Sequence, residues 1–166
     1  MRRRSQPTWN EFDLEPDGFD RFYYVFDQDV EIEWGRSGFD ALNEGRKMAI
    51  RFYWFAAELN NGGLEQYFWN SSGDFAADQI ADFRTIGCDQ YADLLQACCR
   101  KLFNSDIPSR NGDEHRTIIQ ALHESDSSRK DELRAESRLF DDAQQSLAPA
   151  FAAWFRTHPE YFSNLS

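Results

Sequence analysis

The sequence is short of positive charge. Lys and Arg together number 18 against 29 Asp and Glu, which gives a net charge of −11 and a pI near 4.6. A protein that binds nucleic acid directly neutralises phosphates with Lys and Arg, and attraction to an anionic membrane surface needs the same residues. We therefore expect neither nucleic acid nor a membrane as the direct partner.

Cysteine is also scarce, and its three residues, Cys88, Cys98 and Cys99, are odd in number. A secreted disulfide framework would use an even number, so a reduced, cytoplasmic setting fits better. No apolar run reaches the roughly 18 residues of a membrane span. A polar stretch follows Arg2–Arg4, so we expect no secretory signal.

Motifs for catalysis and metal binding are missing as well. His115 and His123 stand eight residues apart, about 12 Å along a helix, which is too far to share a metal ion unaided. The sequence has no phosphate-binding loop, dinucleotide fingerprint or nucleophile elbow. In the Cys98-Cys99 pair we expect one buried and one partly exposed thiol. The sequence thus predicts a non-enzymatic protein without catalytic residues, cofactor or metal.

Aromatic residues, by contrast, make up 16% of the chain, including 15 Phe. Disordered chains contain few aromatics, and a chain of this length buries enough surface for a core. From residue 38 onward the apolar residues recur at helical spacing. We expect an all-α fold, a single compact domain of about seven to nine helices over residues 17–166, preceded by a flexible arm over 1–16.

Breaker residues divide this pattern into segments. Asn60-Asn61-Gly62-Gly63 is expected to end the central helix, and Ser71 or Ser72 to cap a later one. Pro149 is expected to follow a break near residues 147–148 and to begin a final helix, which His158-Pro159 ends. The expected helices before that break include residues 38–60, 64–70, 74–86, 88–104 and 113–124.

The negative charge is concentrated near the N-terminus. Residues 11–33 carry nine acids and one base, a net −8, whereas residues 34–166 carry −6 and residues 1–10 carry +3. One interpretation is a solvated face that aids solubility; the other is a docking surface for a basic partner, because aromatics are interleaved with the acids. The candidate partner-binding residues are Asp20, Asp27, Asp29, Glu31 and Glu33.

Residues 17–34 fit two secondary structures. Apolar side chains from Phe19 to Trp34 fall at helical spacing, with Gly35 as the stop. Acids and apolar residues also alternate over 26–34, as in a strand. We favour the helix, because a lone strand would leave its backbone unpaired.

The most specific stretch of the sequence is residues 58–74. It predicts a helix, a glycine turn, a short helix and a cap. Its polar residues either stabilise this helical corner or form a polar pocket, and both interpretations stay open here. The residues concerned are Glu58, Asn61, Gly62, Gly63, Glu65, Gln66, Tyr67 and Asn70.

This stretch resembles a bacterial family of small all-helical domains, mostly of unknown function, that includes a DNA-mimic protein. The resemblance rests on Glu58, Asn61-Gly62-Gly63, Gln66-Tyr67-Phe68 and Asn70-Ser71-Ser72-Gly73, and it covers about residues 36–157. Leu64 departs from the family, which often has a larger aromatic residue or His at this position.

The resemblance implies a homodimer and a role in transcription regulation, in which carboxylates imitate backbone phosphates and occupy a basic DNA-binding protein. A basic nuclease is the neighbouring class of partner. The alternative function is a small-ligand-binding or catalytic domain with a polar site at the Asn61–Asn70 corner.

Overall fold

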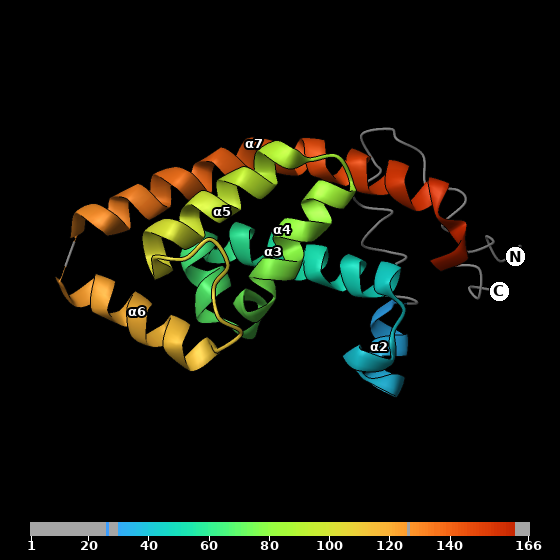
Figure 1. Ribbon diagram of the computed structural model, residues 1–166, viewed down its shortest axis with the longest axis horizontal. Coiled ribbons are helices and arrows are strands. Elements are labelled where there is room, and N and C mark those ends of the chain that lie inside the picture. The colour runs from blue at the N-terminus through green and yellow to red at the C-terminus, as the bar shows by residue number, and fades with distance from the viewer. Residues whose placement is uncertain (1–25, 27–29, 126, 162–166) are drawn as a thin grey trace, which may run out of the picture. The chain divides into compact units, whose positions relative to one another are not determined.

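The computed structural model describes residue 26 and residues 30–125 and 127–161, and within these ranges the regular structure is entirely helical (Figure 1). The predicted all-α class is therefore confirmed. None of the described helices is long and apolar enough to cross a membrane. The elements are α2 (Glu31–Ser37), η3 (Phe39–Ala41), α3 (Glu44–Trp69), η4 (Ser71–Phe75), α4 (Ala76–Thr85), α5 (Asp89–Phe103), α6 (Gly112–Ser125), α7 (Ser127–Thr157) and η5 (Pro159–Tyr161).

The chain divides into two compact units. The first comprises residues 1–50 and 146–166, and the second comprises residues 51–145. The long helices α3 and α7 contribute residues to both. The second unit holds the whole 58–74 stretch, so its packing decides what that stretch does.

The ambiguous segment before residue 35 is helical where it is described. Phe26 and Val30 are buried and helical, and α2 follows from Glu31. The predicted stop at Gly35 is wrong by one turn, because Gly38 ends the helix instead. Gly38 has a φ of +80°, and its amide donates to the carbonyl of Trp34 over 2.8 Å. Gly35 has an ordinary helical conformation, so its missing side chain does not stop the helix.

Non-helical backbone at the glycine pair divides α3 into two helical arms. Gly63 has φ +72° and ψ −162°, a conformation open essentially only to glycine. The chain resumes helical geometry at once and continues to Trp69. The predicted stop at residues 60–63 and the predicted short helix at 64–70 are therefore confirmed, as the kink and the second arm of α3.

The glycines of this corner also permit close approaches. A Cβ added to Gly63 would lie only 2.7 Å from the hydroxyl oxygen of Ser137 on α7. This hydroxyl accepts a hydrogen bond from the Leu64 amide at 2.9 Å. A Cβ on Gly73 would lie 2.7 Å from the Cα of Phe68. Both positions need glycine for space, and Gly63 needs it for conformation as well.

An aromatic cluster forms the core of the second unit. The ring of Phe55 makes edge contacts with the rings of Tyr67, Phe83 and Phe140, at centroid distances of 5.0–5.3 Å. All four side chains are fully buried. Phe55, in the first arm of α3, thus contacts the second arm of α3 as well as α4 and α7.

The predicted capping of α4 by Ser71 or Ser72 is not what the structure has. A short 3₁₀ turn, η4, precedes α4, and Phe75 stands at the N-cap position without a side-chain hydrogen bond. The Ser72 hydroxyl instead donates to the carbonyl of Tyr67 at 3.2 Å. Helices α5 and α6 lie within one residue of their predicted bounds.

The predicted break near residues 147–148 is also wrong, because α7 continues through Pro149 to Thr157. Proline removes one helical hydrogen bond. Pro149 lies on the exposed side of α7, whereas Leu147 and Phe151 are buried. The helix thus continues across the missing bond with buried side chains on both sides of Pro149. The helix ends before Pro159, as predicted.

Replacing Gly63 by Ala should lower the free energy of unfolding by about 2–4 kcal/mol, because the new Cβ is strained and collides with Ser137. Gly87→Ala is the matched control, since Gly87 has a φ of +77° but no atom within 4 Å of the added Cβ. It should cost only about 1–2 kcal/mol. Urea unfolding monitored by circular dichroism measures both. Equal losses would contradict the close approach.

Candidate functional site

The carboxylate of Glu58 is the centre of the 58–74 corner. Glu58 lies on the inner face of α3 and is only 6% exposed. It accepts hydrogen bonds from the Gln66 amide at 2.7 Å and from the Asn70 amide at 2.9 Å to each oxygen. The Ser72 hydroxyl stands 3.5 Å from the same carboxylate. Polar residues from both sides of the glycine bend thus meet at one side chain.

This arrangement stabilises the corner. A buried carboxylate is costly unless hydrogen-bond donors compensate it, and here the donors are neutral amides and a hydroxyl. Gln66 and Asn70 face Glu58 only because the chain reverses at Gly63. Their amides are engaged with Glu58, so they are not turned toward a ligand. This geometry favours the structural interpretation of the corner over the pocket interpretation.

The remaining signature residues lie elsewhere on the same segment. Asn61 is exposed, and Glu65 contacts His123 of α6, with Oε1 2.5 Å from Nε2. Beside this pair is a pocket of about 10 Å³, lined by Glu65, Ile119, Leu122, His123 and Leu133. Its volume suits about one water molecule and is far below that of a metabolite site.

Tyr67 and Leu64 belong to the core. Both side chains are fully buried, and burial raises the pKa of the Tyr67 phenol well above its ordinary value. The Tyr67 hydroxyl has no hydrogen-bond partner among the described residues. Because Leu64 is enclosed, a larger aromatic residue at this position would require its neighbours to repack.

The predicted partner-binding residues are only partly within the described chain. Asp20, Asp27 and Asp29 lie outside the described residues, whereas Glu31 and Glu33 stand in the first turn of α2. Glu31 is exposed and Glu33 is half-buried, and Ile32 between them is 42% exposed. The part of the acidic segment that the structure describes therefore has both a carboxylate and an apolar side chain at its surface.

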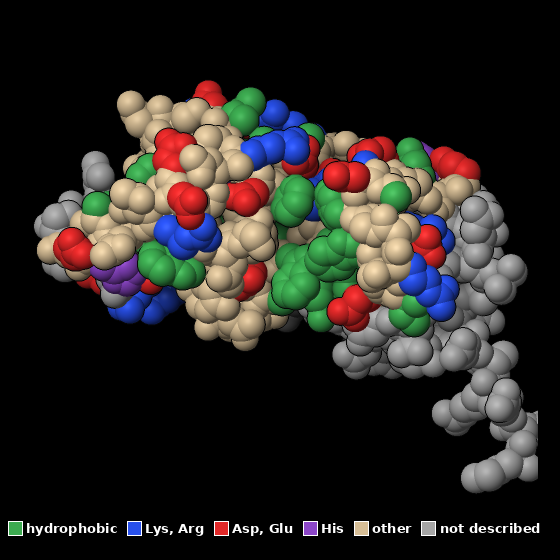
Figure 2. Space-filling view, turned by 90° about the horizontal axis from the view of Figure 1, so that it is seen from below, with side chains coloured by type: hydrophobic (Ala, Val, Ile, Leu, Met, Phe, Trp, Pro, Cys, Tyr) green, Lys and Arg blue, Asp and Glu red, His purple; other side chains and the backbone are tan. Residues whose placement is uncertain are grey.

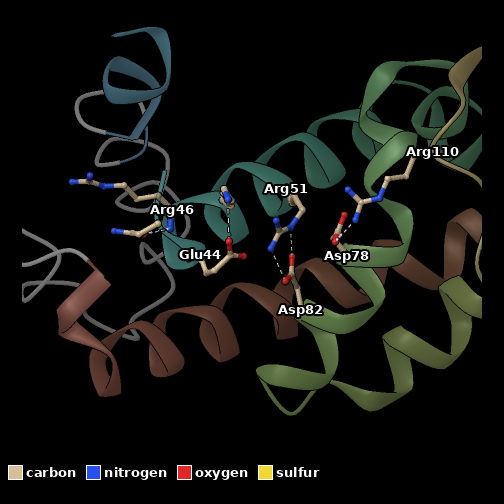
Figure 3. A network of polar contacts seen from close by, with 8 residues as sticks. Glu44, Arg46, Arg51, Asp78, Asp82 and Arg110 are labelled. Carbon is tan, nitrogen blue, oxygen red and sulfur yellow. Dashed lines mark hydrogen bonds and ion pairs between the residues drawn. The ribbon is translucent and has the colours of Figure 1, made fainter. Parts of the chain in front are cut away.

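Carboxylates of the second unit are extensively paired with cations. Arg51 binds Asp82 inside the unit, with Nε 2.6 Å from Oδ2 and Nη2 2.8 Å from Oδ1. Figure 3 shows this pair and the contact of Arg110 with Asp78. On the face in Figure 2, acidic and basic side chains are interspersed. Further pairs are Arg84–Asp93, Arg100–Asp106, Lys101–Glu136 and Arg116–Asp113.

The cysteines are less accessible than predicted. Cys98 and Cys99 are both fully buried, so the expectation of one partly exposed thiol is wrong. Burial raises the pKa of Cys99 to about 12, and that of Cys98 further, because the Glu136 carboxylate also lies beside the Cys98 thiol. Among the described residues, no three His, Cys, Asp or Glu side chains gather as a metal site would require.

Sequence reasoning missed the contacts made across long separations. Ser137, which lies against Gly63, accepts a hydrogen bond from the amide of Leu64, 73 residues away in the sequence. Arg51 and Asp82 are 31 residues apart. No local pattern marks such pairs. Arg51 in an otherwise apolar stretch of a central helix was the one available signal, since a buried charge needs a partner.

Replacing Glu58 by Gln should destabilise the protein by about 2–3 kcal/mol. A neutral amide oxygen accepts hydrogen bonds more weakly than a carboxylate, and the new NH₂ group would face the donor groups of Gln66 and Asn70. Glu124→Gln is the matched control, because Glu124 is exposed and accepts from Gln120. The control should stay within about 0.5 kcal/mol of the natural chain. Thermal unfolding measures both, and a Glu58→Gln variant as stable as the control would contradict this role for Glu58.

Replacing Arg51 alone by Met should cost about 3–5 kcal/mol, because Asp82 is left buried without its cation. The double variant Arg51→Met with Asp82→Leu removes both charges and should be more stable than the single variant. Chemical denaturation of the natural chain, the two single variants and the double variant gives the comparison. A double variant that loses as much as the sum of the two single changes would show that the pair is not coupled.

Comparison with known proteins gives one match. The family model described as DMP19-like protein matches residues 40–158. No curated protein and no solved structure matches the chain. The matched range contains the glycine bend, the Glu58 hydrogen bonds and helices α3–α6. The chain therefore belongs to the DMP19-like family.

Proposed function

We propose that this chain is a non-catalytic acidic protein that binds a basic DNA-binding protein and occupies the surface that DNA would use. The observation that carries the proposal is the −8 charge of residues 11–33, attached to a domain of the DMP19-like family. A DNA mimic needs such a concentration of carboxylates, and the family is the one that the 58–74 signature resembles.

The spacing of helical carboxylates supports this proposal. Duplex DNA carries one negative charge per about 1.7 Å of axis, and acids one helical turn apart have Cβ atoms about 5–6 Å from each other. A row of such acids approximates the charges along one DNA strand. Glu31 and Glu33 stand in the first turn of α2, and Asp27 and Asp29 precede them by four residues each in the sequence.

The density of negative charge favours the N-terminal segment as the binding element. The second unit, residues 51–145, carries 17 acids and 10 bases, a net −7 over 95 residues, whereas residues 11–33 carry −8 over 23. Several carboxylates of that unit lie beside Arg or Lys side chains, which offset their field. Residues 11–33 contain only Arg21 to offset nine acids. A basic partner is therefore attracted most strongly to this segment, and attraction of this kind speeds association and weakens with salt.

The partner class is a basic DNA-binding regulator, with a basic nuclease as the variant that the same electrostatics would accommodate. No observation favours a ligand at the Asn61–Asn70 corner, since Gln66 and Asn70 both bind Glu58. The homodimer and the cytoplasmic setting remain predictions. Sedimentation velocity would test the first of them.

Binding should depend on the acids of residues 27–33. Changing Asp27, Asp29, Glu31 and Glu33 to their amides should weaken capture of a basic partner at least tenfold and reduce its salt dependence. The control changes four surface acids of the second unit, Asp89, Asp93, Asp113 and Glu124, and so removes the same charge. Affinity capture at low salt, followed by titration calorimetry with the captured protein, measures both variants.

The control should bind within about twofold of the natural chain, because its acids lie outside the proposed docking surface. Equal weakening in the two variants would mean that net charge alone attracts the partner. Unchanged binding in the first variant would remove residues 27–33 from the interface.

A further inference from the structure

His115 occupies an unusual position for a titratable side chain. It lies in the first turn of α6 and is fully buried, and neither ring nitrogen makes a hydrogen bond of regular geometry to a described residue. Its ring packs on Phe103 and Phe68, with centroids 4.6 and 6.0 Å apart. Phe68 belongs to the signature corner, so the imidazole is a direct contact between that corner and α6.

A carboxylate stands just beyond hydrogen-bond distance of this ring. Asp74 in η4 places Oδ1 3.8 Å from Nδ1 of His115, and this oxygen is buried without a hydrogen-bond partner among the described residues. A separation of 3.8 Å is too long for a hydrogen bond. Nδ1 of His115 and the buried Oδ1 of Asp74 thus face each other without a direct hydrogen bond.

Charged and polar groups reach His115 from three parts of the chain. Asp74 comes from η4, Glu114 and Arg116 come from α6, and the Ser109 carbonyl comes from the loop before α6. The side chains from α3 and α5 are the uncharged rings of Phe68 and Phe103. Burial lowers the pKa of His115 below its ordinary value, although Asp74, the Ser109 carbonyl and Glu114 oppose this shift.

We propose that the buried ring of His115 is an acid-sensitive contact that keeps α6 on the signature corner at neutral pH and loosens it on acidification, a change that the Asp74 carboxylate opposes. The neutral ring fits its apolar surroundings, whereas a proton adds a charge that the aromatic rings cannot solvate as water does. Loosening would free the Phe68 and Phe103 contacts together. This contact does not depend on the proposed partner.

The sign of the pH dependence follows from linkage. An unfolded histidine titrates near pH 6.5, and the pKa of folded His115 is lower. Below about pH 6.5 the open state therefore binds more protons than the closed state. The contact is at full strength above that pH, and its opening constant rises by up to about tenfold for each pH unit below it.

Hydrogen exchange of the natural chain between pH 7.5 and 5.5, corrected for intrinsic rates, tests this. The opening constant of α6 amides should rise several-fold as the pH falls, whereas that of α5 amides should change little. His115→Phe should abolish the rise, because phenylalanine fills the same space without titrating. His123→Gln and His158→Gln are matched controls and should retain it.

Asp74→Asn distinguishes protonation from packing. Asp74 favours the protonated ring, so removing its charge should extend the rise in α6 opening to lower pH. A purely structural role would weaken the contact equally at every pH. The proposal is overturned if His115→Phe keeps the pH dependence of the natural chain. If that variant does not fold, a uniform Asp74→Asn effect would overturn it equally.

Discussion

The buried carboxylate of Glu58 is the interaction on which the second unit depends. It is held by the amides of Gln66 and Asn70, and both reach it because Gly63 takes a conformation that other residues resist. The bend in turn brings Tyr67 and Phe68 into the aromatic core. Signature residues that read as a polar pocket are therefore the means by which α3 folds back on itself.

This arrangement separates the stability of the chain from its charge. The second unit pairs several of its carboxylates with Arg and Lys at its surface and in its interior, although residues 51–145 keep a net charge of −7. The acids are densest in residues 11–33, which carry −8 over 23 residues. A binding function carried by that segment would use acids other than Glu58 and Asp82, which stabilise the second unit.

Local patterns in the sequence were sufficient for the helical class and for the bounds of α5 and α6, because apolar spacing acts over a few residues. They failed where tertiary packing overrides local preference. Pro149 does not break α7, in which Leu147 and Phe151 on either side of it are buried, and Gly35 does not end α2. The partners of Gly63 and Arg51 lie too far along the chain to be read locally. Their contacts emerge only when the helices pack.

If this chain occupies the DNA-binding surface of a basic protein, that protein should be unable to bind the chain and DNA at the same time. The most direct measurement is a competition between the chain and a duplex for the captured partner at fixed ionic strength, followed by fluorescence anisotropy of the labelled duplex. The predicted result is complete displacement of the duplex. The inhibition constant of the chain should then equal the dissociation constant of its complex with the partner. A stable complex containing the partner, the chain and the duplex would contradict the account.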